Sequence, residues 1–297
     1  MVTGALRVMT LNCGSLIEPG WNERRHEVVA WLERLQPDVV CFQEIWEDAS
    51  TANTAGWIVQ QRSDDRWHWQ FGGAPFGATL WQDDKLLFGS AILSRWPIDT
   101  YTYHRLPIAE DDPDQSPAAI PSHLLHVSTA GLDVFSCHLS PAPTHGRHRC
   151  AQVLAIDELI RCVRGGRDAM PGFGGSRPAM PPVLCGDFNA EPGSDEIRFL
   201  SSLAVLDNRT TFFQDAWRVA GDGPGYTQDW RDNPIAASMN IHRKRIDYVF
   251  VGDPFTRTAS AGRVINAEFA FHEPITGVHA SDHRGLVVDV VWPDRPV

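Results

Sequence analysis

Carboxylate, carboxamide and imidazole side chains flank two apolar runs of this chain. The run Val183-Leu184-Cys185 leads into Gly186-Asp187-Phe188-Asn189, and Ser281-Asp282-His283 stands directly before the last apolar run. Oxygen atoms of Asp and Asn side chains are good ligands for hard divalent cations, and a His beside a carboxylate can move a proton to or from water. These residue types therefore indicate metal-assisted hydrolysis.

Six polar positions in all lie where apolar, strand-like runs begin or end. Taken singly, an Asn or Asp at such a place usually forms a turn, a Glu is usually solvated, and a His is usually a satisfied, partly buried side chain. Turn formation does not require Asp and His at so many ends of core strands, so their joint occurrence carries the functional signal. The positions are Asn12, Glu44, His138, Asp187 with Asn189, Asp247 and Asp282-His283.

The cation-binding part of this set fits the hydrolysis of a phosphate ester. Magnesium takes oxygen ligands and commonly uses only one or two carboxylates together with a substrate phosphate. Glu44 is the best candidate carboxylate, and Asn12, Asp187 and Asp282 are expected close to it. A cation held there would neutralise the phosphate and stabilise the charge that develops in the transition state.

The two histidines of the set suit proton transfer and phosphate binding. His283 needs a partner that fixes its tautomer, and Asp247, within the apolar run 245–251, is a fitting one. His138 can donate a hydrogen bond to a nonbridging phosphate oxygen.

The elements that must position these residues can be read from hydrophobic periodicity. Residues 6–12 form an apolar strand, 22–35 an amphipathic helix, and 39–42 a short buried strand that ends at Gln43-Glu44. If the two strands are parallel neighbours, Asn12 and Glu44 lie at the same edge of one sheet.

The rest of the chain alternates strands with a few helices. This pattern favours a two-sheet core with helices outside, built as a single domain. Segments 109–121 and 165–182 are rich in Pro or Gly and are expected to be loops. The expected strands are 66–71, 89–94, 183–185, 245–251 and 285–291, with a hairpin of 124–127 and 132–138 and a helix over 152–163.

Composition narrows the possible partners. The formal charge of −11 counts against tight nonspecific binding to duplex DNA, although a local basic patch can exist on an acidic surface. The apolar stretches are no longer than strands, which predicts no membrane span, and the first residues lack a signal peptide, so we expect a cytoplasmic location. The six cysteines show no zinc-type spacing and are expected to be buried free thiols.

Seven motifs in order resemble the endonuclease/exonuclease/phosphatase superfamily, which has the fold of pancreatic deoxyribonuclease. The resemblance runs from residue 6 to about residue 291. It implies a four-layer α/β sandwich, with two packed mixed β-sheets flanked by helices, and one catalytic domain over 1–297. The motifs are Thr10-Leu11-Asn12, Gln43-Glu44, 89–94, Ser136-Cys137-His138-Leu139, Gly186-Asp187-Phe188-Asn189, Arg245-Ile246-Asp247-Tyr248 and Ser281-Asp282-His283.

The resemblance also implies roles for these residues. Glu44 with Asn12 would hold Mg²⁺ or Mn²⁺, and Asp282 would bind the metal or support its ligands. His138 would bind the scissile phosphate. Asp187 and Asn189 would position the attacking water or the leaving group, and Asp247 with His283 would form the acid-base pair. Either Asp187 or His283 would take the proton of the water.

The substrate stays open at this stage between a nucleic acid, a phospholipid head group and a small metabolite, as does the oligomeric state. Residues around Asp187 and Asp247 depart from inositol-polyphosphate phosphatases, and those around Asn12 and Glu44 depart from abasic-site endonucleases. Gln43-Glu44-Ile45-Trp46 looks closer to a bacterial branch that includes neutral sphingomyelinase-like proteins.

Three alternative functions follow: a nuclease, a sphingomyelinase-like phosphodiesterase, or a catalytically silent binding module. Arg243 and Lys244 could contact a nucleic-acid backbone, whereas the cluster Arg147–Arg149 is interpreted as solvated charge. For a lipid substrate, Trp67, Trp69 and Trp81 are candidate exposed aromatics, although the first two are expected in the core.

Overall fold

The structure of the chain is a computed structural model that describes residues 4–47, 53–62, 66–76, 86–110, 121–164, 180–239, 242–252 and 260–296. The strands of one sheet are β1 (Ala5–Asn12), β2 (Val39–Glu47), β3 (His68–Pro75), β4 (Leu87–Ser94), β11 (Val264–Ala270) and β12 (Gly285–Val291). The strands of the other are β5 (Ile98–Arg105), β6 (His123–Thr129), β7 (Leu132–His138), β8 (Val183–Asp187), β9 (Phe213–Asp215) and β10 (Asp247–Gly252). The helices are α1 (Trp21–Leu35), α2 (Thr54–Gln60), α3 (Gly146–Val163), α4 (Asp195–Leu200), α5 (Ala216–Ala220) and α6 (Pro234–Met239).

Both sheets have six strands and mix parallel with antiparallel pairs. The first sheet runs β11-β12-β1-β2-β4-β3 and the second β5-β6-β7-β8-β10-β9. The parallel pairs are β1 with β2 and β7 with β8, and both occupy the middle of their sheets. The first two strands are therefore parallel neighbours, which is the condition under which Asn12 and Glu44 share one edge of the sheet.

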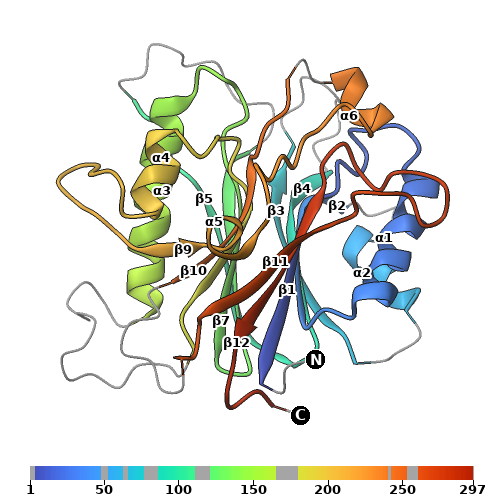
Figure 1. The fold of residues 1–297 in the computed structure, drawn as a ribbon, viewed down its shortest axis with the longest axis horizontal. Helices are drawn as coiled ribbons and strands as arrows, with labels where there is room; N and C mark the ends of the chain where they lie inside the picture. Colours follow the sequence, from blue (N-terminus) through green and yellow to red (C-terminus); the bar gives the residue numbers. More distant parts are fainter. Residues whose placement is uncertain are drawn as a thin grey trace.

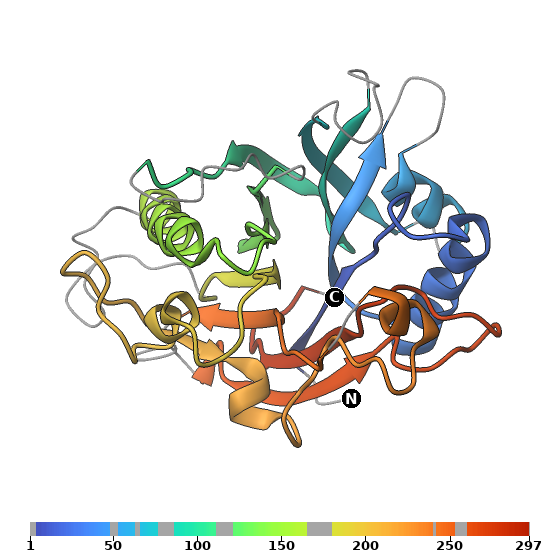
Figure 2. The same cartoon turned by 90° about the horizontal axis from the view of Figure 1, so that it is seen from above.

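The sheets pack face to face between two layers of helices. Figure 1 shows α1 and α2 (blue) outside the first sheet and α3 and α4 (green to yellow) outside the second. Figure 2 shows α3 and α1 on opposite sides of the paired sheets from above. The predicted four-layer α/β sandwich is confirmed.

Successive side chains of the central strands face the other sheet and the helix layer in turn, which explains why these strands are continuous apolar runs in the sequence. In β1, Val8 faces the other sheet while its neighbour Met9 faces the helix layer, and in β2 Cys41 and Phe42 divide in the same way. On the second sheet, Phe135 packs in the outer core beside the helix α3. Because helices cover one face of each sheet and the partner sheet covers the other, both faces of these strands need apolar side chains.

The strands and helices that the sequence analysis missed are short or lie at sheet edges. Strand β5 is mostly exposed, and in β11, at the far edge of its sheet, only every third residue is buried. Strand β9 has three residues, and the helices α2, α4, α5 and α6 have seven or fewer. Such elements bury only one side or too few residues to produce a clear apolar period.

Several predicted boundaries need correction. Helix α3 begins at Gly146, six residues before the predicted start, and β2 continues through Glu44 to Glu47. The hairpin of β6 and β7 is confirmed, with Ala130 and Gly131 as its two-residue turn. The loop predictions for 109–121 and 165–182 fall mainly outside the described residues.

The tryptophan and cysteine predictions hold in part. Trp67 is buried, but Trp69 is 37% exposed, and Trp81 lies outside the described residues. Cys13, Cys41, Cys137 and Cys185 are buried free thiols, whereas Cys150 is half-buried and Cys162 is exposed on α3.

None of the described helices has the length and apolar character that crossing a membrane requires.

Candidate active site

Three neighbouring strands of the second sheet place polar side chains in one row. In the parallel pair of β7 and β8, His138 lies opposite Asp187, and in the antiparallel pair of β8 and β10, Asp247 lies opposite Asp187. Residues directly opposite one another project from the same face of a sheet. The three side chains are at most 2% exposed. Asp187 and His138 lie close to Asn12 and Glu44 of the first sheet.

The first sheet contributes Asn12 and Glu44 from its central strands. Asn12 is the last residue of β1 and pairs with Gln43 of β2. At Glu44 the register of β2 against β4 shifts, and its backbone takes a positive φ of 56°. An extra residue in a strand re-aims the side chains around it, and a positive φ is uncommon outside glycine. Glu44 thus lies at a bulge within the strand, and the predicted strand end at this residue is wrong.

Contacts between the sheets join these two groups. Asn12 donates a hydrogen bond from Nδ2 to Asp187 Oδ2 at 3.0 Å, and Gly14 N donates to Asn12 Oδ1 at 3.0 Å. His138 Nε2 lies 3.6 Å from Asp187 Oδ2 and 3.8 Å from Glu44 Oε1. Gln43, the neighbour of Glu44 in β2, also links the two sheets, since its Nε2 donates to Ser136 Oγ of β7 at 2.9 Å.

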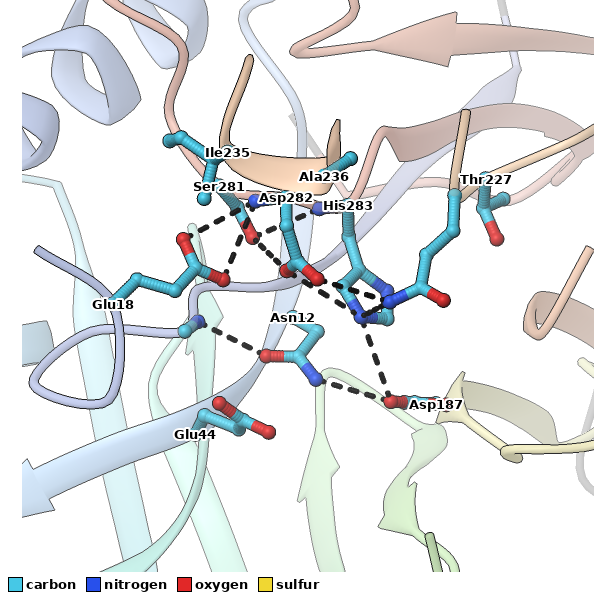
Figure 3. A network of polar contacts seen from close by, with 12 residues as sticks. Asn12, Glu18, Glu44, Asp187, Thr227, Ile235, Ala236, Ser281, Asp282 and His283 are labelled. Atoms are coloured by element: carbon cyan, nitrogen blue, oxygen red, sulfur yellow. Dashed lines mark hydrogen bonds and ion pairs between the residues drawn. The ribbon is translucent and has the colours of Figure 1, made fainter. Parts of the chain in front are cut away.

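An Asp-His pair closes the other side of the site. His283 Nδ1 lies 2.8 Å from Asp247 Oδ2, and His283 Nε2 lies 4.0 Å from Asp187 Oδ2 and 3.7 Å from Asp282 Oδ1. In the neutral form that donates its Nδ1 proton to Asp247, the ring has its lone pair at Nε2. Figure 3 shows Asn12, Asp187, Asp282 and His283 directed toward a common centre, with Glu44 beside them.

Asn189 is held beside the site by its backbone. Asn189 N donates to Asp187 Oδ1 at 2.8 Å, and its side chain donates from Nδ2 to Leu139 O at 3.1 Å. Its φ is 49°, a conformation that Asn tolerates better than most residues. The fold therefore brings all eight residues that the sequence singled out to one end of the paired sheets.

Burial and neighbouring negative charges raise the pKa of two carboxyl groups of the site, whereas that of a third is lowered. Burial, together with the negative charges of Asp282 and Asp187, raises the pKa of Glu44 to about 8. Burial and the charge of Asp247 raise the pKa of Asp187 to about 7. For Asp282, burial acts in the same direction, but the charge of His283 and hydrogen bonds outweigh it and lower the pKa.

The two histidines have opposite electrostatic environments. Burial, with the positive charges of His123 and His283, holds the pKa of His138 well below its usual value. Burial also disfavours charge on His283, but the carboxylates of Asp247, Asp282 and Asp187 outweigh it and raise the pKa of His283 well above its usual value. His138 is thus a neutral hydrogen-bonding group and His283 a strong proton acceptor.

The donor set fits a divalent cation. Single carboxylate or ring-nitrogen atoms of Asp187, Asp247 and His283 lie within 4.8 Å of one another. Asp247 Oδ1 is buried and accepts no hydrogen bond from any described residue. A cation would relieve the repulsion that raises the pKa of Glu44 and of Asp187. This trio differs from the predicted ligands Asn12, Glu44 and Asp282, and Asn12 links the two sets through its bond to Asp187.

Two residues of the site were missed in the sequence. Gln228 donates from Nε2 to Asp282 Oδ2 at 3.0 Å, and the same Nε2 lies 2.9 Å from His283 Nε2. Glu18 accepts from Asp282 N, and Arg24 lies 3.3 Å from it. Burial and its contact with Asp282 raise the pKa of Glu18 to about 10. Neither residue lies at the end of a long apolar run, so no local pattern in the sequence marked it.

The arginines near the site are engaged in ion pairs. Arg245 forms a bidentate pair with Asp215 at 2.8 Å for both contacts, and Arg243 Nε lies 3.0 Å from Asp229. The availability of Arg243 for a nucleic-acid backbone is therefore reduced. Arg149 is also buried and pairs with Glu196 at 2.7 Å, so the interpretation of Arg147–Arg149 as solvated charge is wrong for Arg149.

The Arg245–Asp215 pair predicts a large effect on stability. Both side chains are buried, so Arg245→Ala leaves an unpaired carboxylate inside the protein and should lower the free energy of unfolding by about 3–5 kcal/mol. Urea denaturation measures this change. Arg198→Ala, which breaks the exposed pair with Asp195, is the control and should cost less than ~1 kcal/mol. Equal effects of the two substitutions would contradict the prediction.

The fold and the site together define a metal-dependent phosphoric ester hydrolase. The model of the endonuclease/exonuclease/phosphatase family matches residues 9–283, and the chain belongs to that family. Its enzymes use divalent metals. No curated protein matches the chain significantly.

Solved structures of low sequence identity share the fold. An endonuclease/exonuclease/phosphatase from Beutenbergia cavernae is 20% identical with a TM-score of 0.67, covering 99% of this chain and 73% of that one. TDP2 of D. rerio, solved with a single-strand DNA product, is 16% identical with a TM-score of 0.66, covering 96% and 98%. The human Nocturnin catalytic domain with bound sulfate is 18% identical with a TM-score of 0.65, covering 97% and 94%.

Proposed function

We propose that the chain is one catalytic unit that hydrolyses a phosphate ester through attack of water, with Asp247 and His283 as the acid-base pair. The observation that supports this most is the place of Asp187. Its carboxylate accepts from Asn12, lies 3.6 Å from His138 and lies 4.0 Å from His283. Asp187 thus lies between two kinds of group. Asn12 and His138 are suited to holding a cation and a phosphate, and His283 is suited to moving a proton.

The proposed roles follow from these contacts. Glu44 and Asn12 would hold Mg²⁺ or Mn²⁺ with Asp282, and Asp187, Asp247 and His283 offer a further group of ligand atoms. When bound, the cation would neutralise the phosphate and stabilise the charge of the transition state. Neutral His138 would donate a hydrogen bond to a phosphate oxygen.

The chemical step would proceed in line at phosphorus. Asp187 and the amide of Asn189 would orient the water, whose oxygen forms a bond to phosphorus as the bond to the leaving oxygen breaks. Nε2 of His283 would take the proton of the water, while Asp247 holds the ring and stabilises its positive charge. The proton would then pass to the leaving oxygen.

Metal dependence is the first expected property. Because buried carboxylates repel one another in the metal-free site, binding of Mg²⁺ should stabilise the fold, by about 2.7 kcal/mol at a concentration of about 100 Kd. Thermal unfolding with EDTA and with increasing MgCl₂ or MnCl₂ measures this effect, and hydrolysis should disappear in EDTA and return with added metal. Unchanged melting and undiminished hydrolysis in EDTA would contradict the metal site.

A substrate panel tests the reaction itself. It would contain single- and double-stranded DNA, RNA, sphingomyelin, inositol phosphates and bis-p-nitrophenyl phosphate. Metal-dependent hydrolysis of one class supports the proposed function and separates the nuclease and sphingomyelinase alternatives. A folded, metal-binding protein that cleaves none of them would favour the silent binding module. The cytoplasmic location stays a prediction.

A further inference from the structure

A short extended segment, 227–229, connects the two halves of the proton-transfer pair. Gln228 forms bridges to Lys244 on one side and to His283 on the other. Gln228 N donates to Lys244 O and Lys244 N donates to Gln228 O, both at 3.0 Å, while Arg284 N donates to Thr227 O at 2.6 Å. The segment thus lies between residues that lead into β10 and β12, which belong to different sheets.

This pairing places three side chains on one face. Residues directly opposite one another in antiparallel segments project to the same side, and the 2.9 Å contact of Gln228 Nε2 with His283 Nε2 follows that rule. Lys244, the other partner of Gln228, must project to the same side. Arg243 and Asp229, the neighbours on each segment, meet at 3.0 Å and so take a different direction.

The charge around Lys244 distinguishes it from its neighbours. Arg243 pairs with Asp229 and Arg245 pairs with Asp215, whereas no ion pair of the Lys244 ammonium occurs among the described residues. Lys244 is half-buried, so part of this residue is accessible to solvent. Two strand spacings separate its backbone from that of His283, about 10 Å, and the four-carbon stem of lysine spans most of that distance.

We infer that Lys244 is a substrate-binding residue whose ammonium contacts an anionic phosphate oxygen of the substrate beside His283. The inference rests on the proposed function for the identity of the substrate as a phosphate ester. Lys244 would add to the site a mobile positive charge among carboxylates that otherwise repel an anionic substrate. Lys244 should lower KM more than it raises kcat, because the ammonium can hold the phosphate before as well as during the reaction.

Steady-state kinetics with bis-p-nitrophenyl phosphate test this role. Lys244→Met, which keeps the length of the stem, should raise KM about tenfold and leave kcat within about twofold. Lys244→Arg keeps the positive charge and should restore KM to within about threefold of the wild type. The same Met variant should weaken inhibition by inorganic phosphate. Unchanged KM and phosphate inhibition, or a loss confined to kcat, would overturn the inference.

Phosphate binding separates this inference from the proposed function. The rise in melting temperature on adding inorganic phosphate to the metal-loaded protein requires no turnover. If the wild type hydrolyses none of the panel, the proposed function fails, and a phosphate-dependent rise that Lys244→Met removes still supports Lys244 as a phosphate-binding residue. If Lys244→Met retains the rise of the wild type, or if neither protein shows a rise, the inference is overturned.

Discussion

Glu44→Gln should reduce metal-dependent hydrolysis by at least ~10²-fold, because the substitution keeps the shape of the side chain and removes its charge. Glu44 lies at the bulge of β2, 8% exposed, with Oε1 3.8 Å from His138 Nε2. An amide there cannot neutralise a divalent cation. Initial rates measured over a series of Mg²⁺ concentrations give the size of the loss and the change in apparent metal affinity.

Glu47→Gln is the matched control for this substitution. Glu47 is the last residue of the same strand and is half-buried, so the same chemical change falls outside the site. Its rate and metal dependence should stay within about twofold of the wild type. If Glu44→Gln keeps wild-type activity at every metal concentration, Glu44 is not the metal ligand and the trio of Asp187, Asp247 and His283 becomes the leading candidate.

The stability of the Glu44→Gln variant should change in the opposite direction from its activity. The pKa of Glu44 is raised to about 8, so the folded protein holds this proton more tightly than the unfolded chain does. Unfolding therefore releases the proton, and the metal-free wild type loses stability as the pH rises from about 4.5 to about 8. Urea denaturation in EDTA at the two ends of this range should show a smaller difference for the variant.

His283→Ala should slow turnover by a factor of ~10²–10⁴, the usual contribution of a general acid or base. The ring donates from Nδ1 to Asp247 at 2.8 Å and presents Nε2 toward Asp187, so its removal takes away the proposed proton acceptor. The loss should appear in kcat, with the metal-induced rise in melting temperature reduced by less than half. Single-turnover rates at saturating substrate measure the chemical step directly.

His279→Ala serves as the control for His283→Ala. His279 precedes the motif by two residues and is half-buried, and its contacts do not include the carboxylates of the site. Its substitution should change kcat by less than about twofold. A loss below tenfold for His283→Ala would remove His283 from the proton-transfer role and leave Asp187, whose pKa is about 7, as the group that takes the proton of water.

Many residues of the site could be predicted from the sequence because they lie at the ends of strands. Asn12, His138 and Asp187 each close an apolar run whose two faces are buried, so the polar residue at the end of the run stands out. The order of strand, helix and strand also suggested the condition that β1 and β2 are parallel neighbours, and Asn12 pairs with Gln43 in such a parallel pair. Local pattern and burial coincide at these places.

Edge strands and long-range charge pairs were not accessible in the same way. Strand β5 has mainly exposed residues, so its periodicity resembles that of a loop. Arg243 was predicted to be able to contact a nucleic-acid backbone, because its partner Asp229 lies 14 residues away in the sequence. Ion pairs between distant residues leave no local pattern.

The sequence alone thus determined the central strands, the residue types of the site and the class of chemistry, since each depends on short apolar runs and on what ends them. Tertiary structure decided which groups meet. It set the bulge that aims Glu44, the contact of Asp247 in one sheet with His283 from the other, and the segment carrying Gln228 between them. These features depend on how two sheets are packed against each other, and packing between residues far apart in the chain is not encoded in any local period.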